Sequence, residues 1–113
     1  MSAQHGELAD GRWAQMPFVE QMANIGSEVG RALNWRAKKN DAYSQKACER
    51  ALELMDLTLQ SASGYARRKE LARLREAWTD YYFGSNHFGS SESSWKKYFF
   101  HFNYASRKFK EVQ

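Results

Sequence analysis

The chain has 113 residues, of which 42% are hydrophobic and 15% aromatic, and its formal net charge is +4. This composition predicts one folded domain and excludes a disordered chain. It also holds no apolar run near the roughly 20 residues of a membrane span. Cys48 is the single cysteine, so no intramolecular disulfide can form. With an N-terminus that lacks the apolar core of a signal peptide, this favours a cytoplasmic protein.

Residues 1–15 are polar and predict a flexible N-terminal tail, in which Trp13 is the candidate anchor to the body. Residues 16–113 are assigned to the folded domain. The first helix is predicted to begin at Pro17, whose missing N–H costs nothing at that position. Gly26 and Gly30 each lower helix propensity by about 1 kcal/mol. We expect them to admit another helix, or a bulky ring from the C-terminal helix. The apolar stripe of this first helix contains Phe18, Met22, Ile25, Val29 and Leu33.

The second helix is predicted from a cap at Asn40 or Asp41 to about Gln60. Its apolar residues form a wide arc, as expected of a helix that touches two neighbours. They are Ala47, Cys48, Ala51, Leu52, Leu54, Met55, Thr58 and Leu59. The third helix is predicted over about residues 66–83 and is stopped by Gly84. Its core stripe is Leu71, Leu74, Trp78 and Tyr81.

The last predicted helix, from residue 91 to about 112, has the largest amount of apolar surface to bury. We therefore expect the other helices to pack around it. Ser90 or Ser91 is the expected cap. The core stripe follows steps of three and four residues, which share one helix face. It contains Trp95, Phe99, Phe102, Ala105, Phe109 and Val112.

No alternating apolar pattern indicates a strand. Four helices of roughly 17–22 residues with short connections predict an all-α fold, specifically an antiparallel up-down four-helix bundle with a flexible N-terminal tail.

A second strip of the last helix lies off the core stripe and mixes aromatic with basic side chains. One interpretation is that its rings pack against a neighbouring helix or subunit. The other is a surface for a nucleic acid or protein partner. Among an interface between copies, internal packing and a nucleic-acid surface, we favour the first. The candidate interaction surface consists of Lys96, Phe100, Asn103, Tyr104 and Arg107.

No catalytic constellation is visible in the sequence. His5, His87 and His101 are scattered, and His87 has no partner placed by sequence. Glu49, Glu53 and Asp56 share a helix face without a histidine, which is typical of a solvated acidic edge. Cys48 lies on the apolar arc, where an inert buried thiol is expected. We therefore expect no enzymatic activity, no metal and no cofactor.

Five runs carry a family resemblance: QMANIGSE at 21–28, RALEL at 50–54, LREA at 74–77, DYYFG at 80–84 and KYF at 97–99. Through them, the chain resembles a small uncharacterised bacterial family of all-helical proteins. This resemblance implies a bacterial source and a helical architecture, but no residue roles. In size and helix count the chain is also similar to the rRNA intervening-sequence and retroelement-accessory four-helix bundles. That similarity implies self-association and, for the accessory proteins, nucleic-acid binding.

Residues 31–113 contain 16 basic and 9 acidic groups, so this part carries a charge of +7. Because acids are interleaved with the bases, a solvated surface is the simpler interpretation of the charge. We expect a helical bundle that acts by protein–protein interaction or self-association, with a second copy or another protein as partner and no membrane. The alternative is a basic accessory bundle that binds nucleic acid, whose affinity would fall steeply with salt.

Overall fold

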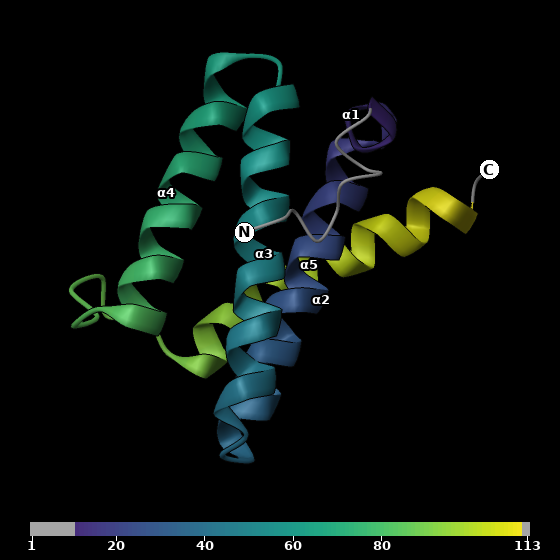
Figure 1. Cartoon of the computed structure of the whole chain (residues 1–113). Helices are drawn as coiled ribbons and strands as arrows, with labels where there is room; N and C mark the ends of the chain where they lie inside the picture. The colour runs from purple at the N-terminus through teal and green to yellow at the C-terminus, as the bar shows by residue number, and fades with distance from the viewer. Residues whose placement is uncertain (1–10, 112–113) are drawn as a thin grey trace.

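The computed structural model describes residues 11–111, and side chains as far as residue 108. Its elements are α1 (Trp13–Gln15), α2 (Phe18–Ala37), α3 (Asp41–Ser61), α4 (Tyr65–Phe83) and α5 (Glu92–Glu111), as Figure 1 shows. The described residues contain no strand. The predicted all-α class is therefore confirmed for this part of the chain.

The centre of the fold is α2, not the aromatic C-terminal helix. The most extensive contacts between elements join α2 to α3, and the next most extensive join α2 to α5. In Figure 1, α2 and α3 lie side by side, while α5 crosses α2 at a steep angle. The expectation that the other helices pack around the last one was wrong, because α2 buries residues on two faces and therefore contacts two neighbours.

Residues at the predicted apolar positions of α2 explain this double contact. Met22, Ile25, Val29 and Leu33 are buried. Gly26 faces α5: a Cβ built on it would lie 2.8 Å from the Phe99 ring, so the expected approach of a bulky ring is confirmed at this glycine. The same expectation is wrong for Gly30, because a Cβ built on Gly30 would meet no other atom of the chain within 4 Å.

Helix α3 begins as predicted, with the Asn40 side chain accepting the backbone N–H of Tyr43 at 3.1 Å. Six residues of its apolar arc are buried: Ala47, Cys48, Ala51, Leu54, Met55 and Thr58. Helix α4 buries Leu71, Leu74 and Trp78. The Trp78 ring meets the Trp95 ring of α5 edge to face, with centroids 5.4 Å apart. This aromatic contact joins the C-terminal half of α4 to α5.

The N-terminal segment is attached through Trp13, as expected. This residue lies in α1 and is only 3% exposed. Its indole N–H donates to the hydroxyl of Thr58 on α3 at 2.9 Å. The Gln21 amide donates to the Trp13 carbonyl at 2.7 Å. The remainder of the predicted tail, residues 1–10, lies outside the described residues.

The finer prediction of an antiparallel up-down bundle is not confirmed. The described chain has five helices rather than four, and α5 runs across α2 instead of alongside it (Figure 1). The predicted core positions Phe109 and Val112 lie outside the described side chains. None of the described helices has the length and apolar character required to cross a membrane.

Candidate functional site

The candidate surface on α5 places two aromatic rings in contact with solvent. Phe100 is 57% exposed and Tyr104 is 52% exposed. They lie one helical turn apart and stack on each other, with centroids 6.4 Å apart and planes inclined by 25°. Internal packing was one of three alternatives for these rings, and it was wrong because neither ring is buried by its own chain.

Charged side chains surround the two rings. The Lys108 ammonium lies 5.6 Å from the centre of the Tyr104 ring. Lys96 forms an ion pair with Glu92 at 3.0 Å, so one acid offsets part of the predicted basic rim. Arg107 is exposed and Asn103 is half-buried. The structure therefore retains the predicted aromatic and basic character of this surface, but with less net charge.

A small hollow lies beside Phe100, between α5 and α2. Its volume is about 240 Å³, and Phe100 contributes to its wall together with Gly30, Leu33 and Asn103. Gly30 leaves open space where a side chain would otherwise project. Sequence reasoning noticed this glycine but assigned it to packing. A ring that projects into solvent and a hollow thus occupy the same face of the molecule.

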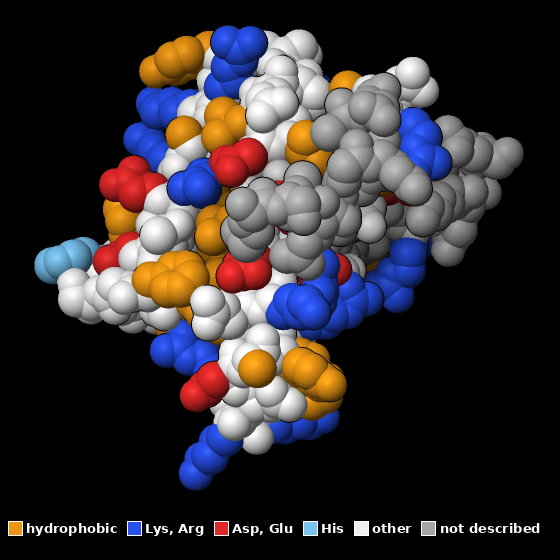
Figure 2. All heavy atoms as spheres, in the orientation of Figure 1, with side chains coloured by type: hydrophobic (Ala, Val, Ile, Leu, Met, Phe, Trp, Pro, Cys, Tyr) orange, Lys and Arg blue, Asp and Glu red, His pale blue; other side chains and the backbone are white. Residues whose placement is uncertain are grey.

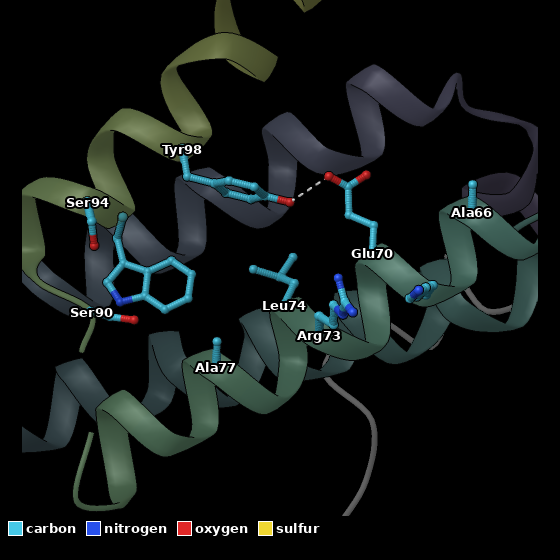
Figure 3. A pocket seen from close by; sticks show the side chains of 10 residues that line it. Ala66, Glu70, Arg73, Leu74, Ala77, Ser90, Ser94 and Tyr98 are labelled. Atoms are coloured by element: carbon cyan, nitrogen blue, oxygen red, sulfur yellow. Dashed lines mark hydrogen bonds between the residues drawn. The ribbon is translucent and has the colours of Figure 1, made fainter. Parts of the chain in front are cut away.

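A larger cleft separates α4 from α5. Its volume is about 670 Å³. Figure 3 shows Leu74 and Ala77 on the α4 side, Ser90 and Ser94 on the other, and Tyr98 extending from α5 towards Glu70 of α4. The Tyr98 hydroxyl donates to the Glu70 carboxylate at 3.1 Å. Burial raises the pKa of the Tyr98 phenol, and the nearby Glu70 charge raises it further, so the phenol remains a donor at neutral pH.

The sequence did not predict this cleft. Tyr98 lies off the core stripe assigned to the last helix. For α4 the sequence indicated only the core stripe Leu71, Leu74, Trp78 and Tyr81. No local pattern gives the separation of two helices that are distant along the chain. The signal that was available was the mixture of Lys69, Glu70 and Arg73 with the apolar Leu74, on the same side of one helix.

His5 lies outside the described residues, and the other candidates that the structure describes are not brought together. His87 lies in an exposed loop, where its backbone N–H donates to Asp80 at 2.9 Å. The edge formed by Glu49, Glu53 and Asp56 is half-buried rather than fully solvated, and Asp56 accepts from Arg75 of α4 at 2.7 Å. Within residues 11–108, no group of three or more histidine, cysteine and acidic side chains is arranged to hold a metal ion.

Cys48 is fully buried, as expected for a thiol on the apolar arc of α3. Burial raises the pKa of its thiol to about 11, which outweighs the opposing effect of the nearby Trp78 indole. Since the thiolate is the nucleophilic form, this thiol is unreactive near neutral pH.

The overall charge does not form a single-sign patch on the face shown in Figure 2. There, Lys and Arg side chains are interspersed with Asp and Glu, and hydrophobic side chains lie between them. Comparisons with protein-family models, curated proteins and solved structures found no match. The surface on α5 and the cleft between α4 and α5 are therefore the two features on which a functional argument can rest.

Proposed function

We propose that this protein is a non-enzymatic, cytoplasmic helical protein that acts by self-association, through the surface formed by Phe100, Tyr104 and the hollow beside Gly30. In this proposal the four long helices form a bundle, predicted to be antiparallel, whose role is to present that surface. The observation that carries the proposal is the pair of stacked rings, each more than half exposed. Contiguous exposed apolar surface is uncommon on soluble monomers unless it is used.

The shape of this face supports a second copy as the partner. A two-fold symmetric interface requires that the same patch be complementary to itself. Here the patch contains both a projecting ring, Phe100, and a hollow of about 240 Å³ next to it. Two copies related by a two-fold axis could each place Phe100 in the hollow of the other. The small size of Gly30 would keep the hollow open, which accounts for a glycine within a helix.

The size of the patch sets the expected strength. Full burial of a large apolar side chain contributes about 1.5–3 kcal/mol, and Phe100 and Tyr104 are already about half covered. Two rings per copy therefore provide only a modest driving force against the entropy cost of association. We expect an equilibrium between monomer and dimer in the micromolar to submillimolar range, rather than an obligate oligomer.

Sedimentation velocity across that concentration range tests the proposal. The average mass of the wild type should rise with concentration, and the Phe100→Ser, Tyr104→Ser double variant should remain monomeric. The matched control is Tyr65→Ser, Phe88→Ser, which removes two rings that are 78% and 58% exposed but lie elsewhere. This control should associate like the wild type. A monomeric wild type at every concentration, or equal association of both double variants, would overturn the proposal.

Filling the hollow gives a second, independent test. Gly30→Leu should abolish association while leaving the monomer folded, since the added side chain enters open space and improves helix propensity. Because the exposed Arg107 and Lys108 of two copies would repel each other, screening by high salt should not weaken the association. Continued association of the Gly30→Leu variant would contradict the proposed role of the hollow.

Nucleic-acid binding is a second candidate for the same surface. It is favoured by the Lys108 ammonium over the Tyr104 ring and by the exposed Arg107, because bases stack on rings while cations contact phosphates. If this candidate is correct, single-stranded RNA should bind with an affinity that falls steeply with salt. The Phe100→Ser, Tyr104→Ser variant should then bind RNA more weakly at every salt concentration.

A further inference from the structure

We propose that the cleft between α4 and α5 is a binding site for a small aromatic carboxylate. Trp95 lines both this cleft and the hollow beside Phe100, but Tyr98, Lys69 and Arg73 line only the cleft, and the proposal does not depend on self-association. Its volume of about 670 Å³ falls within the range of small-molecule sites. Leu74 and Ala77 of α4 and Trp95 of α5 provide the apolar part of its wall.

The rings of the cleft favour a flat apolar body. Trp95 and Tyr98 lie about one helical turn apart on α5. Both line the cleft, as does Leu74 of α4. Figure 3 shows the Tyr98 ring held above Leu74 by its hydrogen bond to Glu70. Aromatic side chains prefer offset or edge contacts with other rings. A planar ligand ring placed beside Tyr98 and Trp95 would make such contacts with little rearrangement.

The charges of the cleft favour an anionic group on that ligand. Lys69 and Arg73 line the cleft from α4. Among the described residues, neither forms an ion pair with a carboxylate. The single acid in the wall, Glu70, already accepts the Tyr98 hydroxyl. The Lys69 ammonium lies 5.8 Å from the centre of the Tyr65 ring, but neither cation is paired with the one acid of the wall. The planar guanidinium of Arg73 suits a carboxylate in a bidentate arrangement.

The same contacts favour a small molecule over a protein segment. The Tyr98–Glu70 hydrogen bond spans the cleft from α5 to α4. A partner helix lying along α4 would have to break this bond and would bury a phenol without an acceptor. A small ligand can occupy the space beside Leu74 and Ala77 with this bond intact.

Titration with three probes of similar shape tests the site. The probes are naphthalene-2-carboxylate, the neutral naphthalene-2-carboxamide and the cationic 2-naphthylmethylammonium. Binding is followed through the indole N–H resonances in ¹H–¹⁵N NMR spectra, which distinguish Trp95 from the other tryptophans. We expect the carboxylate to shift the Trp95 resonance and to bind at least about tenfold more tightly than the carboxamide, with the ammonium probe weakest.

Charge-matched variants locate the anionic subsite. Arg73→Gln and Lys69→Gln should each weaken binding of the carboxylate severalfold and leave binding of the carboxamide unchanged. The control Lys46→Gln removes the same charge from an exposed position on α3 and should have no effect. All three positions are exposed, so the variants are expected to fold. Equal affinity for the three probes, indifference to Arg73→Gln, or shifts confined to other tryptophans would overturn the proposal, as would no binding of the carboxylate at millimolar concentration.

Discussion

At Gly26, the absence of a methyl group determines how closely α5 approaches α2. The nearest Phe99 ring atoms lie 2.8 Å from the position that a Cβ on Gly26 would take, and this ring is itself buried. Gly30, one turn later on the same helix, faces open space. The two glycines therefore have the same cost in helix propensity and different structural reasons for being present.

The glycine pair gives the first prediction. Gly26→Ala should destabilise the fold, because overpacking costs about 1–3 kcal/mol and exceeds the gain in helix propensity. Gly30→Ala should stabilise it by up to about 1 kcal/mol. Thermal melts at a concentration where the protein is monomeric measure both changes. A higher melting temperature for Gly26→Ala would show that Phe99 moves aside without cost.

At the scale of elements, two interhelical ion pairs differ in their burial. Glu28 on α2 is 8% exposed, and it accepts from Arg50 of α3 at 2.8 Å and from Arg31 of its own helix. Asp56 of α3 accepts from Arg75 of α4 at 2.7 Å, but both of these side chains are more than 40% exposed. Water screens the Asp56–Arg75 pair and solvates both charges when they separate. Glu28, in contrast, has little access to water.

The matched variants Arg50→Met and Arg75→Met test this difference. Arg50→Met should lower the free energy of unfolding by about 1–3 kcal/mol, since it leaves a buried carboxylate with one partner fewer. Arg75→Met should lower it by less than about 1 kcal/mol. Urea denaturation at neutral pH measures both. Equal losses would mean that α3 depends as much on its contact with α4 as on its contact with α2.

Over the whole molecule, α2 and α3 form the best-packed unit and α4 is attached less extensively. Eight of the 20 residues of α2 are buried, compared with three of the 19 residues of α4. Residues 65–70, at the start of α4, are all exposed. The contact between α4 and α3 is far less extensive than the contact between α2 and α3. Its contact with α5 includes the aromatic cluster at Trp78 and the Tyr98–Glu70 hydrogen bond.

Hydrogen exchange should reflect this arrangement. We expect amides of α2 and α3 to exchange most slowly, and amides of residues 68–72 in α4 to exchange faster, because local opening needs less energy where fewer side chains are buried. Mass spectrometry of exchanged peptides measures this gradient. A ligand in the cleft should slow exchange in α4 more than in α3. Uniform protection across α2, α3 and α4 would contradict this view of the fold.

The sequence by itself determined the features that depend on near neighbours along the chain. The cap at Asn40 and most of the buried positions of α2, α3 and α4 follow from helical periodicity and local hydrogen bonding. These features extend over one or two turns, where backbone geometry leaves few alternatives.

Only the tertiary structure decided how the helices are placed relative to one another. Periodicity shows which face of a helix is apolar but not which helix covers it. The central position of α2, the crossing of α5 and the cleft lined by Arg73 and Tyr98 were therefore not visible in the sequence. Gly26 illustrates the physical reason. Its contact with Phe99 brings α5 close to α2, and the edge-to-face contact of Trp78 with Trp95 joins α4 to α5. Such contacts depend on the shapes of side chains that are distant in the sequence and meet only in the folded protein.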